Sequence, residues 1–267
     1  MKYIIDHDLH IHSLLSTCSQ NPKQTAERLM EYAKKNNLKR ICVTDHYWDS
    51  EIDGASEWYS VQNFEHISKI KPLPCDDDVE FLFGCETEMD RFFNIGIPRE
   101  RFDDFDFIII PTTHLNTDGF TISYEDTDSN ERRATLWVER LRAVLNMDLP
   151  FHKIGIAHPV SSLMSKGKDE YLKTLKMISD DDMRELFSRA AEVGCGIEIN
   201  HYDMRFSDED SNIILRPLQI AKECGCKFYI GSDAHHPDTF EKCIAILERA
   251  IDLLELRESD KFHLVKR

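Results

Sequence analysis

Two histidines near the start of the chain, His10 and His12, are spaced so that they could chelate one metal ion. They follow a short apolar segment, and side chains two residues apart on a strand point to the same face. A His-x-His pair also occurs often without any metal. The pair therefore predicts a site only if other ligands lie close to it in the fold.

Residues that can bind metals also follow six further apolar segments. In an α/β barrel the carboxyl ends of the strands form one rim, so residues far apart in the sequence would converge there. A mixture of imidazole and carboxylate favours Zn, Mn or Fe over Ca or Mg, which prefer oxygen ligands. The six segments end in Thr44-Asp45-His46, Gly84-Cys85-Glu86, Thr113-His114, Ala157-His158-Pro159, Glu198-Ile199-Asn200 and Ser232-Asp233-Ala234-His235.

The elements that must position these residues alternate along the chain. Apolar segments at 3–5, 40–44, 79–83, 105–110, 154–157, 196–199 and 227–230 are typical of strands. Helix-like segments lie at 22–36, 57–70, 131–145, 181–193, 214–224 and 239–254, while 90–105 and 161–179 are expected to be loops or short irregular helices. Strands that alternate with helices indicate parallel βα units, and about seven of them favour a closed or nearly closed barrel over an open sheet. No repeat or linker divides residues 1–267, which predicts a single domain.

The composition restricts the partners and the location. Of the 267 residues 41% are hydrophobic and 31% are charged, and no apolar segment approaches the roughly 18 residues of a membrane span. We expect a cytoplasmic protein without an export signal, whose eight cysteines are reduced. A net charge of -16 disfavours long nucleic acids and anionic membranes. A small anionic substrate is still compatible with it, because bound metal ions invert the local field.

The motifs, taken together and in order, resemble those of the PHP family, which is named for polymerase and histidinol phosphatase. The resemblance runs from residue 8 to residue 235 and includes Asp8-Leu9-His10-Ile11-His12-Ser13 as well as the segment ends given above. It implies a distorted seven-stranded (β/α)7 barrel of the TIM-like type with a three-metal site.

The resemblance also implies a role for each matching residue. Glu86 would bridge the first and second ions, and Glu86, Asp233 and His235 would carry catalysis through the metals. Asp45 and Glu198 would support the ligands from outside. The first ion would be bound by His10, His12, Glu86 and Asp233, the second by Glu86, His114 and His158, and the third by His46 and His235.

This sequence departs from the family pattern at one position. Where family members usually have an Asp or His, the chain has Thr17 and Cys18. A Cys18 thiolate would be a good zinc ligand. Alternatively Cys18 is a small packed residue and the third ion is weak or absent, so we expect two or three ions. Spacing cannot separate Glu86 from Glu88, and only the Gly-x-Glu match favours Glu86.

These ligands predict a hydrolytic mechanism. Three divalent ions bring more positive charge than Glu86, Asp233 and a Cys18 thiolate return, so the site would attract a phosphate and stabilise a metal-bound hydroxide for in-line attack. The chain has no GxSxG, Walker A or GxGxxG motif, which favours hydrolysis without ATP.

The expected substrate is a small phosphomonoester. Arg205 has a spacing similar to that of a phosphate-binding arginine in the histidinol phosphatases of the family, although an exposed loop arginine would fit equally well. Histidinol phosphate is the best-named candidate. The alternatives are a nuclease or phosphodiesterase that acts on 5′-phosphates or short oligonucleotides, and a noncatalytic module that is stabilised by metal.

Overall fold

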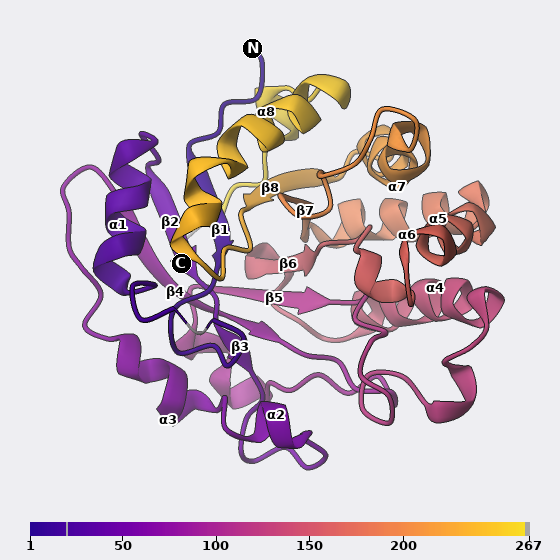
Figure 1. The fold of residues 1–267 in the computed structure, drawn as a ribbon, viewed down its shortest axis with the longest axis horizontal. Coiled ribbons are helices and arrows are strands. Elements are labelled where there is room, and N and C mark those ends of the chain that lie inside the picture. The colour runs from indigo at the N-terminus through magenta and orange to yellow at the C-terminus, as the bar shows by residue number, and fades with distance from the viewer. Residues whose placement is uncertain (20, 265–267) are drawn as a thin grey trace.

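Seven parallel strands follow one another around the centre of the molecule (Figure 1). The computed structural model describes residues 1–19 and 21–264. A further two-residue strand, β3 (His46–Tyr47), pairs with β4 only. In the order of the sheet the seven are β1 (His7–Ile11), β2 (Arg40–Val43), β4 (Glu80–Thr87), β5 (Phe107–Pro111), β6 (Ile154–Ala157), β7 (Gly196–Asn200) and β8 (Lys227–Gly231).

The first and last strands approach each other at their carboxyl ends. Ile11 forms a parallel bridge with Ala234. The Asp233 amide donates to the His10 carbonyl at 2.7 Å, and the His12 amide donates to the Ala234 carbonyl at 3.2 Å. The sheet is therefore a nearly closed barrel, and the predicted fold class is confirmed.

Helices surround the barrel, with α4 to α7 on one side of it and α1 and α8 on the other (Figure 1). The helix α1 shows the general pattern, because Leu29, Met30 and Ala33 on one face are buried. The α-helices are α1 (Ala26–Lys35), α2 (Glu57–Ser60), α3 (Phe64–Ile67), α4 (Asn130–Asn146), α5 (Lys168–Met177), α6 (Asp180–Val193), α7 (Ser211–Glu223) and α8 (Cys243–Leu253). Short 3-10 helices span Ser68–Ile70, Arg99–Asp104, Tyr124–Asp126, Phe151–Lys153, Ser162–Met164, Pro237–Glu241 and Glu258–Asp260.

The sequence-based boundaries were wrong in three places. The first strand is β1, not residues 3–5, because its buried His7, Asp8 and His10 make a strand of the barrel look like a polar loop. The helix expected at 57–70 is broken, since the Asn63 side chain caps the start of a new helix. Within the segment expected to be irregular, α5 forms a regular helix that buries Tyr171.

Apolar side chains fill the amino end of the barrel. Leu9, Leu82, Phe107 and Tyr229 form one buried cluster inside it, together with Phe262 from the C-terminal segment. The Phe262 amide donates to the Phe228 carbonyl at 2.8 Å, at the amino end of β8. Each such large side chain stabilises the fold by about 1.5–3 kcal/mol through burial. The carboxyl end of the barrel, opposite this cluster, is where the polar strand ends meet.

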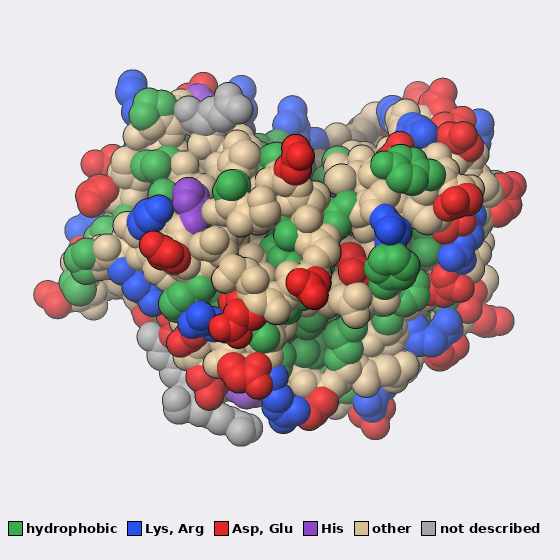
Figure 2. All heavy atoms as spheres, turned by 90° about the horizontal axis from the view of Figure 1, so that it is seen from below, with side chains coloured by type: hydrophobic (Ala, Val, Ile, Leu, Met, Phe, Trp, Pro, Cys, Tyr) green, Lys and Arg blue, Asp and Glu red, His purple; other side chains and the backbone are tan. Residues whose placement is uncertain are grey.

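The surface agrees with the acidic composition of the chain. On the face shown in Figure 2, acidic and basic side chains are interspersed and hydrophobic side chains lie between them. Among the helices within the described residues, none combines the length and the apolar character that crossing a bilayer requires.

Candidate metal centre

The predicted ligands converge at the carboxyl ends of the strands, where three groups of side chains could each hold a metal ion. Within each group the ligand atoms lie within 4.8 Å of one another. Glu86 belongs to two of the groups, as expected of a bridging carboxylate. The groups are His10, His12 and Glu86; Glu86, His114 and His158; and His12, Cys18, His46 and His235.

His10 and His12 face each other with bare ring nitrogens. Nδ1 of His10 lies 2.8 Å from Glu198 Oε1, and a carboxylate can only accept, so this nitrogen carries the proton. Nδ1 of His12 lies 3.0 Å from Ser16 Oγ, whose own proton goes to Asp45 Oδ1 at 2.7 Å. When both rings are neutral, as metal ligands must be, the two Nε2 atoms therefore present lone pairs to each other across 3.1 Å. A cation between them would turn this repulsion into ligation.

Glu86 occupies the centre of the site. It is 1% exposed, and its Oε2 has no hydrogen-bond partner within the described part of the chain. This oxygen lies 2.9 Å from His46 Nδ1 and 3.4 Å from His12 Nε2, while Oε1 lies 3.0 Å from His158 Nε2. An orphaned buried carboxylate oxygen surrounded by imidazole nitrogens fits divalent cations.

The second group is oriented by side chains that sequence reasoning did not assign. His114 Nδ1 donates to Glu88 Oε2 at 2.6 Å, and His158 Nδ1 donates to Thr113 Oγ1 at 3.1 Å. Both histidines thereby turn Nε2 towards the site. Glu88, which also accepts from the Tyr59 hydroxyl at 2.9 Å, is committed to holding His114 and does not belong to any of the three ligand groups found within residues 1–19 and 21–264.

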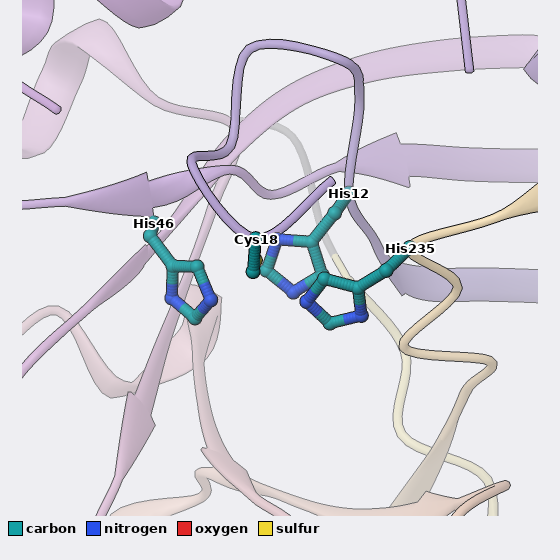
Figure 3. Close-up of side chains that lie close together, drawn as sticks. All are labelled: His12, Cys18, His46 and His235. Atoms are coloured by element: carbon teal, nitrogen blue, oxygen red, sulfur yellow. The ribbon is translucent and has the colours of Figure 1, made fainter. Parts of the chain in front are cut away.

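Cys18 joins the third group from the loop between β1 and α1, and Figure 3 shows its side chain among the rings of His12, His46 and His235. His235 Nδ1 donates to the Asp233 carbonyl at 2.8 Å, which leaves its Nε2 free for a ligand. Burial disfavours the thiolate, but His46 and His235 outweigh it and lower the pKa of Cys18 to about 7. A thiolate is the form that binds zinc.

The electrostatics of the site call for positive charge. Burial opposes a charged His10, but the carboxylates of Glu198, Asp233 and Glu86 outweigh it and raise the pKa of His10 well above its ordinary value. Burial likewise opposes a charged Glu86, yet His46 and His10 hold its pKa well below the usual range. The Asp233 carboxylate lies 3.2 Å from His12 Nε2 and 3.5 Å from His10 Nε2. Metal ions would supply the charge that the histidines otherwise provide as imidazolium groups.

The backbone is strained at two of the predicted ligands. His158 has a φ of 27° and Asp233 a φ of 51°, values that residues other than glycine rarely adopt. His158 directly follows β6 and Asp233 lies two residues after β8, and strain of this kind concentrates at functional sites. The turn out of each strand aims the side chain at the cluster.

Glu198 and Asp45 support ligands in different ways. Glu198 contacts His10 directly and accepts from the His158 amide at 2.6 Å. Its place depends on Gly231, because a Cβ there would lie 1.8 Å from Glu198 Oε1. Asp45 accepts from Ser16 Oγ, and Ser16 in turn contacts the His12 ring. Asp45 therefore orients His12 and not the side chain of its neighbour His46. The backbone amide of His46 donates to the same Ser16 Oγ at 3.2 Å.

Arg205 lies outside the ligand groups but lines a cavity that reaches them. The cavity has a volume of about 730 Å³ and is also lined by His158, Asp233 and His235. The Arg205 side chain is exposed, and its guanidinium lies 5.7 Å from the centre of the Tyr202 ring. It is therefore free to meet a ligand that enters the cavity.

The remaining residues near the motifs take no part in the three groups. His236 is exposed and caps the 3-10 helix that follows it, while His201 is buried. Sequence reasoning missed Ser16, Tyr59 and Thr113, because each acts through a contact between elements far apart in the chain. For Glu88 the two-residue spacing from Glu86 placed it near the site, but its role in orienting His114 depends on contacts that the sequence does not show.

A comparison with protein families identifies the family to which these motifs belong. The model of the PHP domain matches residues 8–201, which contain all the predicted ligands except Asp233 and His235. The chain belongs to the PHP family. The match to the PHP domain thus covers the strand ends from β1 to β7, and the final pair of predicted ligands lies in the turn after β8.

Relatives and a solved structure agree with membership of the PHP family. A probable phosphatase of Thermoanaerobacter sp. (strain X514) is 27% identical over 266 residues, which cover 94% of this chain and 87% of that protein. A probable phosphatase of Caldicellulosiruptor saccharolyticus is 23% identical and covers 88% and 82%. A histidinol phosphate phosphatase from Lactococcus lactis, solved with zinc, L-histidinol and phosphate, shares the fold with a TM-score of 0.55 at 18% identity, over 93% of this chain and 94% of that one. This PHP chain is therefore similar to phosphatases throughout its barrel.

Proposed function

We propose that this PHP protein is a phosphatase that hydrolyses a small phosphomonoester at a centre of three divalent metal ions. His10, His12, Glu86 and Asp233 would hold the first ion, and Glu86, His114 and His158 the second. Cys18, His46 and His235 would hold the third. The observation that carries the proposal is the pair of imidazole Nε2 atoms, 3.1 Å apart, beside the orphaned Oε2 of Glu86.

The ions would supply Lewis acidity, which activates water and neutralises the charge of a phosphoryl group. The chain's own residues fix the arrangement. Glu198 and Ser16 keep His10 and His12 in the tautomer that turns Nε2 inward, and Glu88 does the same for His114. Apart from Cys18, all the ligands are at least partly buried, so the site excludes much of the bulk water. We place Arg205 at the substrate phosphate, where its two-pronged guanidinium would pair with oxygens that no ion neutralises.

We propose zinc, manganese or iron as the metal and histidinol phosphate as the first substrate to test. The zinc, L-histidinol and phosphate in the Lactococcus lactis protein support both choices. The chain would work in the cytoplasm, where its eight cysteines, all free in the structure, are kept reduced. The net charge of -16 supports a small substrate over a long nucleic acid or a membrane.

Phosphate release by purified protein tests the proposal. The protein would be stripped of metal, reloaded with Mn, Zn or Fe, and offered histidinol phosphate, 4-nitrophenyl phosphate, nucleoside 5′-phosphates and a labelled oligonucleotide. We expect metal-dependent release from the monoesters and none with Glu86→Ala. Cleavage of the oligonucleotide alone would assign a nuclease, and loaded protein without activity on any of these esters would indicate a noncatalytic module.

A further inference from the structure

The cavity beside the metal centre is much larger than a phosphate needs. Its volume of about 730 Å³ lies in the range of sites that hold whole organic ligands. It runs from His158, Asp233 and His235 at the centre to the loop after β6, α5, the loop after β7 and α7. A phosphate at the metals would leave most of this space to the organic part of the substrate.

Apolar surface makes up the larger share of the cavity walls, although the ion pair of Lys168 and Asp210 also lines the far part. Val160 and Leu163 come from the loop after β6, Leu172 from α5, Phe206 from the loop after β7 and Ile214 from α7. Walls of this kind favour an aliphatic or aromatic body by burying its surface, at about 25 cal/mol per Å². Apolar walls give little discrimination among such bodies, so selectivity depends on the polar groups placed among them, above all on those that still lack a partner.

One of these polar groups is a carboxylate with unused hydrogen-bonding capacity. Asp203 lines the cavity, and its Oδ2 is shielded from solvent without a partner in the part of the chain that the structure describes. The other acid in this part of the cavity, Asp210, is already paired with Lys168 at 2.7 Å. Burial, the largest influence, raises the pKa of Asp203 to about 8, with His158 opposing and Glu198 and Asp233 adding to the rise.

An unsatisfied carboxyl group of this kind destabilises the empty protein, since a buried polar group without a partner costs about 1–3 kcal/mol. A ligand that brings a donor removes the cost. A ligand with a methyl group at the same place does not remove this cost, and it also keeps water away from the oxygen. This asymmetry is the basis on which sites built around a hydrogen bond reject analogues that lack it.

Resting on the proposed phosphatase function, we propose that Asp203 is a specificity-determining residue, which selects phosphomonoesters whose organic part carries an ammonium or another N–H donor. The phosphate lies at the metal centre, the body of the substrate lies along the apolar walls, and the donor reaches Asp203. Arg205, exposed on the same loop, stays available for the phosphate.

A matched pair of substrates tests the inference. 5-Aminopentyl phosphate and hexyl phosphate have the same length, and they differ only in an ammonium in place of a terminal methyl group. A charge-assisted hydrogen bond is worth about tenfold to a hundredfold in kcat/KM, so we expect the wild-type protein to prefer the amino compound by that ratio. In Asp203→Asn the ratio should fall at least about fivefold.

Asp208→Asn is the matched control, because it makes the same change on the same loop. Its side chain is 97% exposed and pairs with Arg249 at the surface, and we expect it to keep the wild-type ratio. Thermal unfolding monitors the fold of both variants, and Asp203→Asn should be no less stable than wild type, since it removes an unsatisfied carboxylate. Equal turnover of the two substrates by wild type, or an unchanged ratio in Asp203→Asn, would overturn the inference.

Calorimetric binding of the same two phosphates separates this inference from the proposed function. If the metal-loaded protein hydrolyses neither phosphate nor any other monoester, the phosphatase proposal fails. A binding preference for the amino compound that Asp203→Asn removes would then still support the role of Asp203. Equal binding of the two compounds to the wild type would refute it.

Discussion

Two glutamates on one strand do different work because their neighbours differ. Glu86 lies near the end of β4 and Glu88 directly follows the strand, and both are 1% exposed. Glu86 faces the inward-turned imidazole nitrogens of the ligand groups, whereas Glu88 accepts from His114 Nδ1 and from the Tyr59 hydroxyl. The first arrangement suits a cation, and the second is already satisfied.

Glu86→Ala should abolish binding of at least one ion per chain and lower kcat/KM more than about a hundredfold, because a bridging ligand supports two ions. Glu88→Ala should keep the ions at saturating metal and weaken the second by about 10- to 100-fold, the usual effect of losing a residue that orients a ligand. Elemental analysis and metal titration of the two variants measure this difference. Equal metal loss would show that both glutamates are ligands or that the wrong one has been assigned.

Cys18 distinguishes this chain from the family pattern, and its low pKa makes it open to a chemical test. Alkylating the metal-free protein at pH 7 should remove the third ion on reloading and leave the first two, since a thioether no longer offers a negative charge. Metal counts before and after modification check this. Cys75 is also exposed, so Cys75→Ser supplies a background in which Cys18 is the exposed target. An unchanged count with Cys18 fully modified would exclude it as a ligand.

At the scale of elements, the site is built where strands end and the backbone turns. His158 and Asp233 adopt positive φ at these turns, and the loop after β7 brings both Asp203 and Arg205 to the cavity. The strand ends and the first residues after them thus fix the metal ligands. Residues further along the loops supply the groups that we place at the substrate. Such a division lets specificity change without disturbing the barrel.

Arg205→Ala tests the part of the loop that we place at the phosphate. We expect unchanged metal content and a loss of about ten- to a hundredfold in kcat/KM on phosphomonoesters, the worth of a charge-assisted hydrogen bond. Lysine should restore only part of the activity, because a point charge does not reproduce the planar fork. Steady-state kinetics with metal analysis measure both. Full activity of the alanine variant on every monoester would remove Arg205 from the site.

Most of the strands and the ligand motifs were predictable because their signals are local. The strand at 154–157 is uninterrupted and apolar apart from one glycine, and β6 has those bounds. The strand β1 was misplaced because barrel strands that carry ligands bury polar side chains. The Ser16 link between Asp45 and His12, and the open oxygen of Asp203, depend on packing between distant segments, which spacing along the chain does not encode.

At the scale of the whole molecule, the metal centre joins opposite sides of the barrel. Its candidate ligands come from β1 and the loop after it, from β3 and β4, and from the turns after β5, β6 and β8, so bound ions would act as cross-links between strands. Without them, buried carboxylates and histidines depend on one another for charge. Stability and metal content should therefore be coupled.

Removing the metal with a chelator should lower the midpoint of thermal unfolding. An ion present at a hundred times its Kd contributes about 2.7 kcal/mol, and a chain of this size shifts by roughly 2–4 °C per kcal/mol, so each ion lost should cost roughly 5 °C or more. Calorimetry before chelation, after it and after reloading with Zn or Mn measures the change. A midpoint that stays constant through verified loss of all metal would contradict the coupling.

The closure of the barrel by its first and last strands has a consequence for biosynthesis. His10 leaves the ribosome early, whereas Asp233 and His235 are among the last parts of the barrel to be made. The complete cage for the first ion does not exist until β8 docks beside β1. Under the proposed metal centre, the first ion would therefore be acquired only after β8 has docked, and its identity would be set by the metal pool that the folded barrel meets.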